Sequence, residues 1–224
     1  MTQKSEIIAE RSSQIPDESA GSYRRNLLEI TVAFLLVMAA VWTPAGRLNS
    51  FFSTSAAACV LAFAISGRWS SREMGLSRPF TGAGKILLAG AALCGAIWLA
   101  GVSLKHAGPA YAIPWSRSWQ YAIWAVVQQF ILQSIFFVRL EPMIGSDRTI
   151  LAVTALYAIA HIPNPVLTVL SFIGGIVFCE MFCRWRNIFP IGTIHAALGL
   201  TIAASFPDRW LHHMRVGIGY LAAR

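Results

Sequence analysis

The sequence predicts an all-α protein, a polytopic membrane helical bundle of about seven transmembrane helices. Of its 224 residues, 56% are hydrophobic and 12% are charged, whereas a soluble domain carries roughly 25% charged residues. The mean hydropathy is +0.57. In lipid, only helices and closed barrels satisfy every backbone polar group. Because the apolar runs are rich in Leu, Ala and Gly, we expect helices.

Seven apolar runs mark the expected helices, since a spanning helix needs about 20 apolar residues, with a range of about 17 to 25. Most runs fit or nearly fit this length, but the fifth is too short. They cover residues 27–43, 51–66, 84–104, 119–140, 149–161, 166–183 and 188–205. Trp210, Tyr220 and the glycines between them leave an eighth, interfacial segment open.

The two ends of the chain differ from this bundle. Residues 1–26 are polar, mixed in charge and without a hydrophobic period, which predicts a flexible cytoplasmic tail. The first apolar run begins at Leu27, too late for a cleaved signal peptide, so we expect it to remain as a membrane anchor. The bundle is expected over residues 27–205, with its motif core at about 119–205, followed by a polar or interfacial tail at 206–224.

The net charge of +8 comes from short basic clusters beside the apolar runs, which is typical of topology signals and argues against nucleic-acid binding. Short loops rich in Lys and Arg face the cytoplasm, which predicts an integral protein of a bacterial inner (plasma) membrane with its N-terminus inside. Membrane lipid is the expected environment. The cytoplasmic side is marked by Arg24, Arg25, Arg68, Arg72, Arg78 and Lys85, and by the Arg139/Arg148 and Arg184/Arg186 loops.

The short fifth run predicts a cavity. About 13 helical residues reach roughly 20 Å, less than the roughly 30 Å hydrocarbon core. Two prolines follow in His161-Ile162-Pro163-Asn164-Pro165, and proline removes an amide donor and disfavours helix before it. Irregular backbone at membrane depth is tolerated only where protein buries it or water lines it. We therefore expect a polar cavity next to His161.

Several polar side chains should meet at this cavity, because such groups are costly in hydrocarbon. Measured from the cytoplasmic helix ends, His161 lies roughly 18 Å deep, Gln128 roughly 16 Å and His195 roughly 10 Å. Gln129 and Gln133 are four residues apart and share a helix face. The expected chamber is a wet pocket of amides and histidines without a carboxylate of its own.

Three short motifs follow one another on successive predicted helices. They are Gln128-Gln129-Phe130-Ile131-Leu132-Gln133, then Tyr157-Ala158-Ile159-Ala160-His161, then His195-Ala196-Ala197-Leu198-Gly199. Their order resembles Glu-Glu-x-x-x-Arg, Phe-x-x-x-His and His-x-x-x-Asn of the CAAX prenyl endopeptidase and bacteriocin-processing (CPBP, abortive-infection) family. That family consists of glutamate-dependent intramembrane proteases. The resemblance covers roughly residues 68–205.

The resemblance implies roles for these positions. Gln128 matches the glutamate that deprotonates a water, while His161 and His195 match residues that orient this water and stabilise the oxyanion. Gln129 matches the second glutamate of the catalytic pair, and Gln133, Tyr157 and Gly199 would line the site. Gln129, Gln133 and Gly199 depart from the family's Glu, Arg and Asn. An amide cannot be a general base, and loss of such a base typically costs roughly 10²- to 10⁴-fold in rate. The resemblance therefore implies a divergent or inactive protease.

Three functions remain open from the sequence. The first is a divergent endopeptidase acting on a membrane-proximal peptide, with His161 or His195 as a weaker base. The second is a non-catalytic peptide- or protein-binding immunity factor, chaperone or regulator. A small transporter is a weaker alternative, because paired broken helices are not evident. No cofactor or metal is predicted, since the four cysteines lack a Cys-x-x-Cys motif. Substrate identity, prenyl dependence and oligomeric state are left open.

Overall fold

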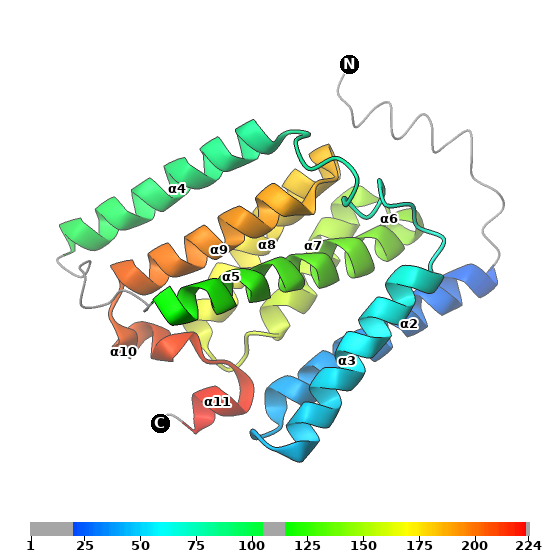
Figure 1. Ribbon diagram of the computed structural model, residues 1–224, viewed down its shortest axis with the longest axis horizontal. Helices are drawn as coiled ribbons and strands as arrows, with labels where there is room; N and C mark the ends of the chain where they lie inside the picture. The colour runs from blue at the N-terminus through cyan, green and yellow to red at the C-terminus, as the bar shows by residue number, and fades with distance from the viewer. Residues whose placement is uncertain (1–19, 105–114, 223–224) are drawn as a thin grey trace.

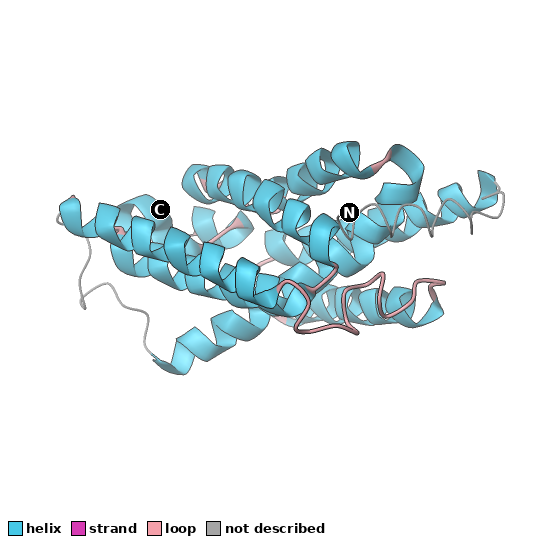
Figure 2. Cartoon of the chain, turned by 90° about the horizontal axis from the view of Figure 1, so that it is seen from above, coloured by secondary structure: helices cyan, strands magenta, loops and turns pink. Residues whose placement is uncertain are grey.

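A computed structural model describes residues 20–104 and 115–222, and every regular element in those residues is a helix (Figure 2). The all-α membrane bundle predicted from composition is confirmed. Within these residues, six helices are long and apolar enough to cross a membrane, and α7 is the shorter one expected from the fifth run. The main helices are α2 (Ala20–Trp42), α3 (Arg47–Ser66), α4 (Ala83–Ser103), α5 (Trp115–Gln129), α7 (Ser146–Ile159), α8 (Pro165–Trp185) and α9 (Ile188–Ser205).

The helix that begins as α5 continues through a π-helical stretch, η2 (Phe130–Phe137), into α6 (Val138–Ile144). A π-helix has a wider turn than an α-helix and occurs often at functional sites. Here it begins directly after Gln129, and six successive residues from Leu132 to Phe137 are buried. The fourth apolar run is thus one long helix whose middle is surrounded by protein.

The helices form a central group with one flanking unit at either edge (Figure 1). The α5–η2–α6 helix, α7, α8 and α9 make up the centre, with α7 against α8 and α5 against α9. Helix α4 packs on α9 at one edge, and the α2–α3 hairpin packs on η2 and α6 at the other. The motif-bearing helices therefore lie together in the middle of the molecule.

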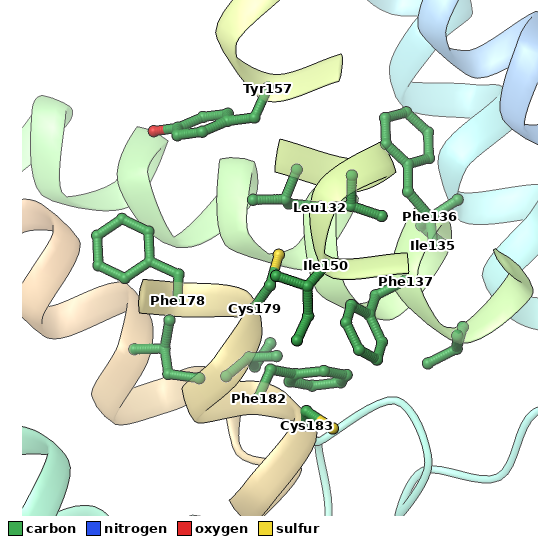
Figure 3. Packing of buried hydrophobic residues seen from close by; sticks show 14 of the residues in the cluster. Leu132, Ile135, Phe136, Phe137, Ile150, Tyr157, Phe178, Cys179, Phe182 and Cys183 are labelled. Carbon is green, nitrogen blue, oxygen red and sulfur yellow. The ribbon is translucent and has the colours of Figure 1, made fainter. Parts of the chain in front are cut away.

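The apolar core lies where η2, α7 and α8 meet (Figure 3). The rings of Phe137 and Phe182 pack edge to face with centroids 5.5 Å apart, a favourable aromatic geometry. Tyr157 lies at the border of this cluster, and its hydroxyl points away from the aliphatic side chains of Leu132 and Ile135 (Figure 3). This border is where the polar site begins.

Asparagine caps start the two last long helices. The Asn164 side chain accepts a hydrogen bond from Leu167 N at 3.1 Å, with Pro165 as the first residue of α8. Both features favour helix initiation. Asn187 caps α9 in the same way and donates to the carbonyls of Pro79 and Thr81 at 2.8 and 2.9 Å. These caps attach α8 and α9 to distant segments of the chain.

The boundaries of the bundle differ from those predicted. Helix α2 begins at Ala20, so residues 20–26 are helical rather than part of a flexible tail, and Asn26 is buried. Hydrophobic periodicity could not reveal this part of the helix, because the side chain that it buries, Asn26, is polar. The remainder of the predicted N-terminal tail, residues 1–19, lies outside the described residues.

The predicted C-terminal tail is packed rather than free. It forms the short helices α10 (Asp208–Leu211), η3 (His212–Met214) and α11 (Gly217–Leu221). They pack against the turn that follows α7. Asn164 donates to the carbonyls of Leu211 and Arg215 at 2.9 and 3.1 Å, and Gly217 N donates to Ile162 O at 3.0 Å. This segment satisfies the irregular backbone that follows the short α7.

Two arginines expected in cytoplasmic loops are buried instead. Arg139 is 0% exposed, and its guanidinium donates to Glu29 at 2.7 Å and to the Phe63 carbonyl at 2.7 Å. Arg186 pairs with Glu141 and lies against the rings of Phe137 and Phe182. Both form tertiary ion pairs that local sequence does not reveal, so neither counts as a loop charge.

Removing Glu29 should strongly destabilise the protein, because Arg139 would keep a buried charge without its carboxylate. We expect Glu29→Ala to lower the free energy of unfolding by about 3–5 kcal/mol, the usual cost of breaking a buried pair. The matched control is Glu180→Ala, whose partner Arg184 is 57% exposed and whose loss should cost at most about 1 kcal/mol. Chemical denaturation in micelles measures both, and equal losses would contradict the prediction.

Candidate functional site

A cavity of about 790 Å³ lies among α4, α5, α8, α9 and the C-terminal segment. Its walls are mostly aliphatic and aromatic. Ile173, near the middle of α8, lines the cavity and is 56% exposed, so the cavity opens on a membrane-facing side of the bundle. Such concave, largely apolar sites with a few convergent polar groups are typical of ligand-binding sites.

Four of the residues singled out from the sequence meet in this cavity: Gln128, Tyr157, His161 and His195. Gly199 lines it as well. Gln129 and Gln133 do not reach the cavity and are 0% exposed. The adjacent glutamines therefore have different environments, one in the wall of the cavity and one in the protein interior behind it.

His195 is fixed by hydrogen bonds at both ring nitrogens. The Gln129 amide lies 3.1 Å from Nδ1, and the Tyr157 hydroxyl lies 3.0 Å from Nε2. The Gln133 amide donates in turn to Gln129 Oε1 at 3.3 Å. The tautomer of the ring sets the direction of both bonds. We name this chain of Gln133, Gln129, His195 and Tyr157 the polar relay.

His161 is oriented differently. Its Nδ1 lies 2.8 Å from the carbonyl oxygen of Tyr157, one turn earlier in the chain. A carbonyl can only accept, so Nδ1 carries the proton and the neutral ring keeps Nε2 as an acceptor. The ring also packs edge to face on Tyr157, with centroids 4.7 Å apart. His161 thus presents one fixed acceptor beside the cavity.

Tyr121 is a lining residue that the sequence interpretation missed. It lies seven residues before Gln128 on α5, a spacing that places both on one helix face, and both line the cavity. A Cβ at Gly199 would overlap the Tyr121 hydroxyl. The position of the third-motif side chain is therefore occupied by a tyrosine from another helix. The heptad spacing from Gln128 was the available signal.

One end of the cavity carries charge. Arg117, Asp208 and His213 line it there, and the Asp208 carboxylate lies 2.9 Å from His213 Nε2. The expectation of a chamber without an ionisable acid was therefore wrong for the cavity as a whole, because the C-terminal segment folds back over it. Ten residues of α9, about 15 Å of helix, separate His195 from the end of α9 that precedes Asp208.

The two buried cysteines of α8 belong to the protein interior. Cys179 lies 3.6 Å from the Gln133 amide, and Cys183 lies in the apolar core. Within residues 20–104 and 115–222, no three His, Cys, Asp or Glu side chains come close enough to hold a metal ion.

Comparison with protein families identifies the central helices. Residues 110–201 match the family described as type II CAAX prenyl endopeptidase Rce1-like. This segment is similar to that family. The CAAX-endopeptidase-like segment holds all three motifs and includes η2, α6, α7 and α8, whereas the α2–α3 hairpin, α4 and the C-terminal segment lie outside it. No curated protein and no solved structure matches the chain.

The two adjacent glutamines should differ sharply in their effect on stability. Gln129→Met would leave His195 Nδ1 without its partner and the Gln133 amide with only the weak acceptor Cys179 Sγ, where a buried unsatisfied group costs about 1–3 kcal/mol. We expect a loss of about 2–4 kcal/mol in the free energy of unfolding. Gln128→Met is the matched control and should change stability by at most about 0.5 kcal/mol. Denaturation in micelles that gave the same loss for both would refute the polar relay.

Gly199 should be energetically coupled to Tyr121. Gly199→Ala would push a methyl group into the tyrosine and cost about 1–3 kcal/mol, as overpacking does. In a Tyr121→Ala background the same change should cost at most about 0.5 kcal/mol. Gly95→Ala is the control, because a Cβ there meets nothing within 4 Å. A double-mutant cycle measured by thermal unfolding tests this, and additivity would argue against the contact.

Proposed function

We propose that the protein is a CAAX-endopeptidase-like membrane protein that binds a membrane-proximal peptide in the cavity and does not cleave it by the family's glutamate chemistry. One observation carries the proposal: the side chain at the cavity wall in the first motif, Gln128, is an amide. An amide can hold a peptide or a water by hydrogen bonds, but it cannot take a proton from water at neutral pH.

The surrounding carboxylates do not substitute for the missing base. Glu29 pairs with Arg139, and Glu141 pairs with Arg186. Glu180 pairs with its helix neighbour Arg184, as four-residue spacing favours. Asp208 lies at the charged end of the cavity with His213. Each described carboxylate named here thus has a cationic or histidine partner away from Gln128.

The polar relay also favours binding over catalysis. Both nitrogens of His195 are engaged by Gln129 and Tyr157, so the ring has no free nitrogen for a substrate oxyanion unless the relay breaks. A buried network of hydrogen bonds that joins several helices rigidifies the site. A rigid wall with an apolar lining suits retention of a bound chain.

A second candidate function rests on His161. Its Nε2 is an unprotonated acceptor in the cavity, and histidine can act as a general base. A slow endopeptidase centred on His161 is therefore the alternative. The Gln128-based proposal and this alternative differ in what happens to cleavage when His161 is removed.

A cleavage assay in membranes separates the two. The panel is wild type, His161→Ala, Asp208→Asn and the double change Gln128→Glu with Gln129→Glu, each incubated with membrane-anchored peptides. We expect no product from wild type and bound peptide on pull-down. We also expect cleavage to appear in the double glutamate variant, since two carboxylates restore a base. Wild-type cleavage that is lost in His161→Ala would instead establish the alternative.

The membrane orientation belongs to the same proposal. The chain would lie in a bacterial inner membrane with its N-terminus in the cytoplasm, and the bound peptide would belong to a partner it protects, holds or regulates. The basic residues between α3 and α4, Arg68, Arg72 and Arg78, support that orientation, because such clusters remain on the cytoplasmic side. Arg139 and Arg186 are buried and are therefore left out of the count of basic loop residues. The remaining loop residues still favour the same orientation.

A further inference from the structure

Three polar groups in the cavity wall retain hydrogen-bonding capacity. They are the Gln128 amide, the Tyr121 hydroxyl and Nε2 of His161, and all three residues line the cavity. The described residues provide no hydrogen bond to the first two, and His161 uses only Nδ1. By contrast, Gln129 and His195 are already paired with each other. These three groups are therefore available to a ligand, whereas His195 and Tyr157 in the same lining are already paired.

Their chemistry divides into donors and one acceptor. Gln128 and Tyr121 lie on one face of α5 and can both donate, through an amide and a hydroxyl. His161, at the end of α7, must accept at Nε2 because its Nδ1 donates to the Tyr157 carbonyl. The hydrogen bond to its own helix holds this tautomer. The site thus offers donors from one wall and an acceptor from another.

The charged lining residues are Arg117 and, in the C-terminal segment that packs against the turn after α7, Asp208, whose carboxylate is paired with His213. Eleven residues of α5 separate Arg117 from Gln128, about 16 Å along the helix. Apolar side chains such as Trp124 and Leu198 lie in the lining as well. A charged ligand group beside Gln128 would lose its hydration without a counter-ion, which is costly. The inner groups suit an uncharged partner that has both an acceptor and a donor.

We propose that the inner wall of the cavity is a subsite for a single secondary amide of the bound peptide. Tyr121 and Gln128 donate to its carbonyl oxygen, and His161 Nε2 accepts from its N–H. This inference rests on the proposed peptide-binding function and adds to it the residues and the polarity of recognition. Tyr121 is a binding residue, and its hydroxyl occupies the space that a side chain at position 199 would fill.

Replacing amides by esters in the ligand tests this directly, because an ester keeps the carbonyl and removes the N–H. The probe is a pool of N-terminally fluorescent, C-terminally amidated pentapeptides of Leu, Val, Ala and Phe. Five extended residues at roughly 3.3 Å each match the roughly 16 Å from Arg117 to Gln128. Binding to the full chain in lipid nanodiscs is followed by fluorescence anisotropy, and the tightest pentapeptide is then made with an ester at each position in turn.

We expect one ester position to weaken binding roughly 3- to 10-fold, the effect of one hydrogen bond, while the others change it less than about 2-fold. In His161→Phe, which keeps the ring packing on Tyr157, this penalty should disappear. Tyr121→Phe should weaken the amide and the ester ligands equally. Tyr23→Phe, an exposed tyrosine on α2, is the matched control and should leave binding unchanged.

The outcomes separate the two proposals. Peptide binding with no position-specific ester penalty in wild type would overturn the amide subsite while leaving the peptide-binding function intact. A penalty that persists in a folded His161→Phe would also overturn it, and so would an unchanged affinity in Tyr121→Phe. If no peptide in the pool binds at all, the peptide-binding function fails and the subsite fails with it.

Discussion

The polar relay is the interaction on which the site depends. Gln133, Gln129, His195 and Tyr157 are all buried and come from η2 and its junction with α5, from α9 and from α7. Each would be costly in a membrane interior without a partner. Paired with one another, they connect three helices through hydrogen bonds. The relay fixes the wall from which Gln128 and His161 face the cavity.

The relay also explains how a protease-like framework can persist without a glutamate base. Amides donate and accept at once, so Gln129 satisfies His195 on one side and Gln133 on the other. A carboxylate at the same place would accept only. The amide at position 129 therefore has a structural role, because it connects Gln133 to His195. Gln128 takes no part in the polar relay. Its side chain lies in the cavity wall and is free to contact a ligand.

The short α7 creates a second constraint, and the C-terminal segment resolves it. Asn164 caps α8 with its oxygen and holds the segment with its nitrogen through the carbonyls of Leu211 and Arg215. The same segment brings Asp208 and His213 to the charged end of the cavity. The side chain of Asn164 thus both starts α8 and holds the C-terminal segment beside the cavity. Backbone polarity at membrane depth demands such partners.

The sequence by itself determined the helical membrane class, the approximate position of the long helices and several of the polar residues that line the cavity, because hydropathy and helical spacing are local properties. It did not determine which glutamine faces the cavity, that Tyr121 fills the space at Gly199, or that Arg139 and Arg186 are buried. Those features depend on pairing between residues far apart in the chain. Only the tertiary packing of α2, α5, α9 and the C-terminal segment brings such partners together, and no local pattern encodes that choice.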